Sequence, residues 1–75
     1  MRSEKEYDDL FEKEVNTVIE IHLNVEGLIF VTMAGSDLTK EIVEALESES
    51  NIFDLDNVEF EDWGDEHLYT IPFKV

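Results

Sequence analysis

The chain has 75 residues, of which 20 are Asp or Glu and 5 are Lys or Arg, so its formal net charge is -15. A small domain needs a net charge of only about 2–8 for solubility, and the larger charge found here opposes compaction. The chain has no cysteine, which excludes disulfides and thiolate metal sites. No apolar run approaches the roughly 20 residues of a membrane span and no signal peptide is visible, so we expect a cytoplasmic protein.

The apolar content indicates a folded domain despite the charge. Hydrophobic residues make up 43% of the chain, with 5 Phe, 2 Tyr and 1 Trp, and disordered acidic chains are depleted in these types. The length predicts one domain over residues 1–75. Salt adaptation is an alternative reason for the acidity. The preference for Glu over Asp disfavours this alternative. Anionic membranes and nucleic acid are poor direct partners because both repel an acidic surface.

Residues 4–14 are predicted to form a short amphipathic helix. Ser3 and Glu6 have the spacing of a capping box, in which each side chain bonds the backbone amide of the other residue. The apolar residues that follow fall at positions i, i+3 and i+4: Tyr7, Leu10 and Phe11. A single stripe on three turns cannot hold a helix alone, so this helix must dock on the rest of the domain.

Residues 15–33 are predicted to form a β-hairpin. Residues 15–25 alternate with the period of a half-buried strand. The expected inward side chains are Val15, Thr17, Ile19, Ile21, Leu23 and Val25, and the outward ones are Asn16, Val18, Glu20, His22, Asn24 and Glu26. Glu26 and Gly27 supply the turn. The apolar run over residues 28–33 suits an interior strand or one covered on both faces.

A second helix is predicted after the break at residues 34–36, with Ser36 or Asp37 as its cap. Its inner side carries Leu38, Ile42, Ala45 and Leu46, and its outer side carries Glu41, Glu44 and Glu47. Residues 48–51 are expected to be a polar exit from the helix.

Two short strands are predicted to close the chain. In residues 57–63, Val58 and Phe60 should point inward and Glu59 and Glu61 outward, and Gly64 allows a turn. The inward residues of the last strand are then Tyr69, Ile71, Phe73 and Val75. Pro72 lacks an amide hydrogen, which predicts that this strand lies at a sheet edge or carries a bulge.

These elements predict an α+β fold in the order α-β-β-α-β-β. Antiparallel hairpins would form one sheet, with both helices packed on one face. The other face would be acidic if Glu20, Glu26, Glu59 and Glu61 all point outward.

No pattern indicates an enzyme, a metal site or a cofactor. Residues 54–65 lack the Gly and the Glu that an EF-hand loop requires, so they are interpreted as a solvated turn. His22 and His67 have no nucleophile at a recognisable spacing and are interpreted as surface histidines. Three glycines cannot build a phosphate-binding loop.

Trp63 lies on the same side of its strand as Glu59 and Glu61, and two interpretations stay open. The side chain could cap the end of the core, or it could be an aromatic anchor within an acidic rim, because Trp is enriched in interface hot spots. Exposure of the indole decides between them.

The carboxylates are the strongest candidate for a binding site. Alternate residues on a strand lie about 6.7 Å apart, and helix neighbours about 5–6 Å, which resembles the spacing of phosphates along a nucleic-acid strand. A merely solvated acidic surface is the alternative. The candidate partner-binding residues are Glu20, Glu26, Glu41, Glu44, Glu47, Glu59, Glu61, Asp62, Trp63 and Asp65.

In its size and its rows of acids the whole chain resembles small acidic inhibitors made by phages and mobile elements, including DNA mimics and anti-CRISPR proteins. That class shares no diagnostic motif. The resemblance implies a non-enzymatic inhibitor that binds a basic groove of a nuclease or CRISPR effector in the host cytoplasm. An immunity protein or antitoxin against a basic nuclease toxin is an alternative, and an acidic adaptor or regulatory subunit is another.

Overall fold

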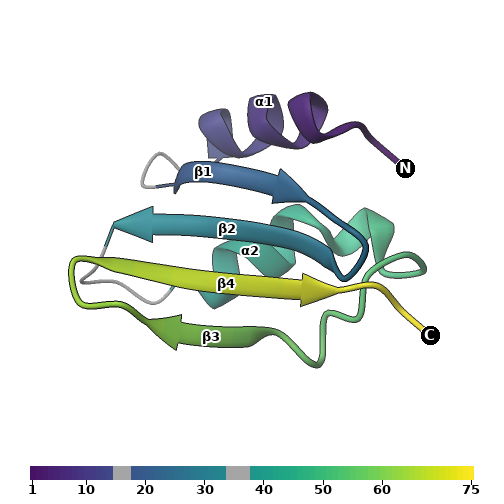
Figure 1. Cartoon of the computed structure of the whole chain (residues 1–75). Helices are drawn as coiled ribbons and strands as arrows, with labels where there is room; N and C mark the ends of the chain where they lie inside the picture. The colour runs from purple at the N-terminus through teal and green to yellow at the C-terminus, as the bar shows by residue number, and fades with distance from the viewer. Residues whose placement is uncertain (15–17, 34–37) are drawn as a thin grey trace.

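The structure is a computed structural model that describes residues 1–14, 18–33 and 38–75, without the side chains of residues 13 and 14. Its elements are α1 (Glu4–Glu14), β1 (Val18–Leu23), β2 (Gly27–Met33), α2 (Thr39–Ala45), the 3-10 turn η1 (Glu47–Glu49), β3 (Glu59–Asp62) and β4 (Glu66–Pro72). The strands form one antiparallel sheet in the order β1-β2-β4-β3 (Figure 1). The predicted α+β class and element order are confirmed.

The core lies between the sheet and the two helices. It contains Tyr7, Phe11, Ile21, Leu28, Phe30, Leu38, Ile42, Leu46, Phe53, Tyr69 and Ile71. Phe11 of α1 packs edge-on against Phe30 of β2, with ring centroids 4.6 Å apart. Ile42 of α2 belongs to the same cluster. The apolar stripes predicted for the two helices are therefore the sides that they bury, and both helices pack on one face of the sheet.

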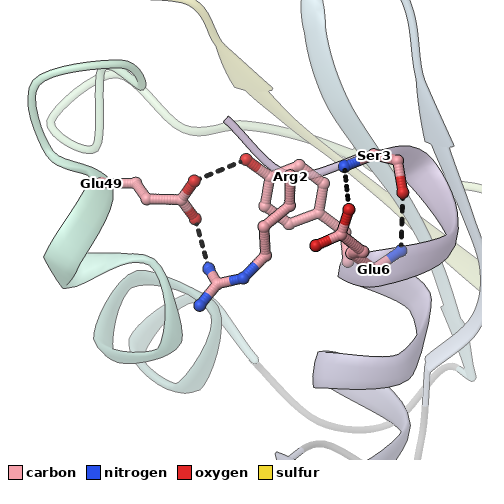
Figure 2. Close-up of polar contacts among 5 residues, drawn as sticks. Arg2, Ser3, Glu6 and Glu49 are labelled. Carbon is pink, nitrogen blue, oxygen red and sulfur yellow. Dashed lines mark hydrogen bonds and ion pairs between the residues drawn. The ribbon is translucent and has the colours of Figure 1, made fainter.

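The first helix begins with the predicted capping box. The Ser3 amide donates to Glu6 Oε1, and the Glu6 amide donates to Ser3 Oγ, both at 3.3 Å (Figure 2). These bonds satisfy two of the amides that have no partner within the helix. The cap predicted for the second helix at Ser36 or Asp37 lies outside the described residues. The Leu38 amide donates to the Tyr69 hydroxyl at 3.1 Å.

Glu49 is buried, which corrects the prediction that residues 48–51 are only a polar exit. Its carboxylate accepts a 2.8 Å hydrogen bond from the Tyr7 hydroxyl and forms an ion pair with Arg2, in which Nη1 lies 2.7 Å from Oε2 (Figure 2). Burial, followed by the bond to Glu49 and its negative charge, raises the pKa of Tyr7 to about 12. The carboxylate thus joins the start of α1 to the turn after α2.

The alternation predicted for residues 15–25 holds only in part. A β-bulge between Val18 and Glu20 breaks the register with β2, and an extra residue of this kind reverses the faces of the side chains on either side of it. Ile19 is consequently exposed, whereas Val18 packs against the core. Val25 is also exposed because the strand has already ended. Val15, Asn16 and Thr17 lie outside the described residues.

The hairpin turn depends on Asn24 and Gly27. Asn24 Oδ1 accepts hydrogen bonds from the amides of Glu26 at 2.8 Å and Gly27 at 3.2 Å. Gly27 has a φ of +149°, and a Cβ atom there would overlap the Ile71 carbonyl and lie 2.8 Å from Pro72 Cα. Glycine is required because β4 passes so close to the backbone at this position.

The last strand is an interior strand, which corrects the edge position predicted from Pro72. β4 lies between β2 and β3, and its register contains no bulge. Pro72 is tolerated because β3 begins at Glu59, opposite Thr70, and so has no residue paired with Pro72. The Pro72 carbonyl accepts from the Asp54 amide. Tyr69 and Ile71 are buried as predicted, whereas Val75 is fully exposed beyond the strand.

Candidate functional site

The face of the sheet opposite the helices carries two transverse rows of side chains. The first row follows the register Glu20–Val31–Leu68–Glu61 across β1, β2, β4 and β3. The second row follows the register His22–Ile29–Thr70–Glu59. We call these eight residues the open sheet face. Neither described helix covers it, because both pack on the other side (Figure 1).

The open sheet face is apolar at its centre and acidic at its edges. Val31 is 9% exposed, and Ile29 and Leu68 are half-buried. The exposed carboxylates lie on the outer strands, Glu20 on β1 and Glu59 and Glu61 on β3. Three strand spacings separate these edges, which is roughly 14 Å. The sequence pattern predicted the acids but not the apolar centre, for which the uninterrupted run of residues 28–33 was the available signal.

No lysine or arginine lies within the four strands. Lys5 of α1 lines a depression at the β1 edge together with Glu20 and His22. His22 Nε2 lies 3.2 Å from Glu20 Oε2, but both side chains are more than half exposed. Arg2 pairs with Glu49, and Lys40 with Glu44 at 4.0 Å, both away from this face. Glu59 and Glu61 have no lysine or arginine in their own strand or in the adjacent β4, so they produce a negative potential at this edge of the apolar centre.

An open depression of about 610 Å³ lies toward the β3 side of this face. Its lining residues are Glu26, Ile29, Glu59, Phe60, Glu61, Leu68 and Thr70. Three of the predicted partner-binding residues, Glu26, Glu59 and Glu61, are thus brought to one rim. Ile29 and Leu68 supply apolar surface within the same hollow.

Trp63 is 57% exposed, which contradicts the interpretation of this residue as a cap on the core. Its indole Nε1 donates to Glu61 Oε2 at 3.2 Å. The indole is therefore held beside an acidic residue of the open sheet face. The other interpretation, an aromatic anchor within an acidic rim, stays a prediction.

Asp62 is directed away from the open sheet face. In the register it lies opposite His67, on the side of the sheet that carries Phe60 and Tyr69. Its Oδ1 atom lies 3.6 Å from His67 Nε2 and accepts from the Gly64 amide at 2.9 Å. Asp62 thus stabilises the turn between β3 and β4, and Asp65 is exposed within that turn.

His67 is not a surface histidine, contrary to the prediction. Its side chain is only 15% exposed, and its ring lies 4.9 Å from that of Phe60 in an edge-to-face arrangement. Nδ1 is buried and has no hydrogen-bond partner among the described residues. His22, in contrast, is exposed as predicted.

The remaining predicted residues belong to a different surface. Glu41, Glu44 and Glu47 are exposed on and just after α2. Because α2 packs against the core side of the sheet, these acids lie on the opposite side from Glu59 and Glu61 (Figure 1). The candidate residues therefore form two separate acidic surfaces, and the open sheet face combines its carboxylates with a depression and an apolar centre.

No family model, curated protein or solved structure matches this chain. Within residues 1–14, 18–33 and 38–75, no group of three or more His, Asp or Glu side chains has the arrangement of a metal site. None of the described helices is long and apolar enough to cross a membrane.

Proposed function

We propose that this protein is a non-enzymatic inhibitor whose open sheet face binds a basic, nucleic-acid-binding groove of another protein. Glu20, Glu59 and Glu61 would occupy positions that backbone phosphates take in that groove. The observation that carries the proposal is that this face, which neither described helix covers, has carboxylates at both edges and no lysine or arginine in its strands. The resemblance to small acidic phage inhibitors points to a nuclease or CRISPR effector as the partner.

The charge of the face and of the whole chain supports binding to a basic protein. Lys and Arg side chains in a partner groove would pair with carboxylates that have no lysine or arginine in the four strands. The net charge of -15 would accelerate the encounter with a basic protein through long-range attraction. That attraction weakens as salt shortens the Debye length, which is about 10 Å at 0.1 M.

Competition with nucleic acid tests the proposal. Immobilised protein is exposed to a cell lysate, and bound proteins are eluted either with duplex DNA or with NaCl at matched ionic strength. We expect captured proteins that bind nucleic acid and that DNA releases more effectively than salt does. Captured proteins that bind DNA while they remain on the immobilised domain would contradict groove occlusion.

A further inference from the structure

We infer that the open sheet face docks a basic amphipathic α-helix of the partner, with the apolar side of that helix against Ile29 and Leu68. The inference rests on the proposed function, because it names the element of a basic protein that this face receives. It adds an apolar contact that mimicry of phosphates does not require.

The dimensions of the face fit one helix. The acidic edges are roughly 14 Å apart, and an α-helix with its side chains is about 10–12 Å across. The two rows lie two residues apart, about 7 Å along the strands, and the central strands β2 and β4 that carry them have 7 residues each, about 23 Å. A helix of about 15 residues has the length of these strands. A helix along this axis places its flanks toward Glu20 on one side and toward Glu59 and Glu61 on the other.

The chemistry of the face selects the composition of that helix. An apolar centre with charged edges is the usual anatomy of a protein interface, in which a dry core is surrounded by a polar rim. The depression lined by Ile29, Leu68 and Thr70 would receive one large apolar side chain. Lys or Arg on both flanks of the helix would meet Glu20 on one edge and Glu59 and Glu61 on the other.

Two other occupants fit less well. A second copy of the chain would bring carboxylates against carboxylates, because the face contains no lysine or arginine. An added β-strand would need a free edge, but the Leu23 amide of β1 already donates to Glu4 Oε2 at 3.0 Å. The other edge strand, β3, has only 4 residues, three of them acidic.

Synthetic peptides provide the probe. The first is an 18-residue peptide of Leu, Lys and Ala with its leucines on one helical face, and the second has the same residues in an order that spreads the leucines around the helix. We expect the amphipathic peptide to bind at least about 10-fold more tightly and to gain helical circular dichroism on binding. Equal affinity for both peptides would overturn the inference, as would a stable dimer of the protein alone in light scattering.

Variants of the protein locate the contact. Ile29→Thr combined with Leu68→Thr should weaken binding of the amphipathic peptide about 10-fold, because Thr suits a strand but removes apolar surface. Ile19→Thr is the control, since Ile19 is 48% exposed but lies at the bulge, outside the two rows. Circular dichroism confirms that each variant is folded. Unchanged peptide binding by the folded double variant would overturn the inference.

The same variants separate this inference from the proposed function. Suppose that Glu59→Lys with Glu61→Lys abolishes capture of the DNA-released partner but Ile29→Thr with Leu68→Thr does not. The face is then a phosphate mimic and helix docking is wrong. If neither pair affects capture, the proposed function itself is wrong. Loss of binding in both pairs, with Ile19→Thr unchanged, supports both.

Discussion

The Tyr7 hydroxyl donates a 2.8 Å hydrogen bond to the carboxylate of Glu49, 42 residues later in the chain. Tyr7 is fully buried and Glu49 is 9% exposed. The bond therefore connects the first helix to the turn after the second one, across the edge of the core. Glu49 therefore has a structural role, unlike the many carboxylates that are exposed to solvent.

Replacement of Glu49 by Gln should destabilise the domain, although it removes one negative charge. The amide retains the size of the side chain but weakens the pairing with Arg2 and with the Tyr7 hydroxyl, at a cost of about 1–3 kcal/mol. Glu47→Gln is the matched control, because Glu47 is exposed and its neutralisation only reduces repulsion. Urea unfolding measures both variants. Equal stability of the two would show that the bonds to Glu49 contribute nothing.

Stability should fall between pH 10 and pH 12 through Tyr7. The pKa of this hydroxyl is about 12 in the fold, against 10.0 for an ordinary tyrosine. The folded state therefore holds the proton more tightly, so this contribution is fully present below pH 10 and is lost as the pH rises toward 12. We expect the stability difference between the wild type and Tyr7→Phe to decrease from pH 9 to pH 11.5. A constant difference would contradict the assignment.

Gly27→Ala should be strongly destabilising, whereas Gly64→Ala should be milder. Both glycines have positive φ angles, +149° and +86°, which cost a residue with a Cβ atom about 1–3 kcal/mol. At Gly27 the added carbon also meets the backbone of Ile71 and Pro72, but at Gly64 it has nothing within 4 Å. Thermal unfolding compares the two variants. A larger loss for Gly64→Ala would contradict the close approach of β2 and β4.

Ile21→Ala should lower the free energy of unfolding more than Ile19→Ala does, although both residues were predicted to point inward. Ile21 is 6% exposed and Ile19 is 48% exposed. We expect Ile21→Ala to cost about 2–5 kcal/mol, as other truncations of buried isoleucines do. Ile19→Ala should cost less than about 1 kcal/mol. Denaturant unfolding checks both values, and similar costs would indicate a regular strand without the bulge.

Local patterns predicted the elements of this fold better than the environment of individual side chains. The spacing of Ser3, Glu6 and Tyr7 predicted the capping box and the buried stripe because these interactions occur within one or two turns of a helix. Alternation identified the outward position of Glu59 and Glu61 for the same reason. It misplaced Val18 and Ile19 because Ile19 is an extra residue with no partner on β2, so the faces before it are reversed relative to those after it.

The errors elsewhere arise from contacts between residues far apart in the sequence. Burial of Glu49 depends on Tyr7 and Arg2, and no pattern around Glu49 indicates either partner. Pro72 was assigned to an edge because the sequence does not show that the pairing of β3 with β4 stops at Thr70, before Pro72. Similarly, the apolar centre of the open sheet face follows from the register that brings Val31 beside Leu68.

The central claim is that the open sheet face, and not overall acidity, binds the partner. Its most direct test compares the affinity of the captured, DNA-released partner for two charge-matched variants, Glu59→Lys with Glu61→Lys and Glu41→Lys with Glu47→Lys. Both pairs change the net charge equally, but the second lies on the other side of the molecule. The account predicts a loss of about 3 kcal/mol, roughly 100-fold, for the first pair and less than about 10-fold for the second. Equal losses for the two pairs, or wild-type affinity in the folded first pair, would contradict it.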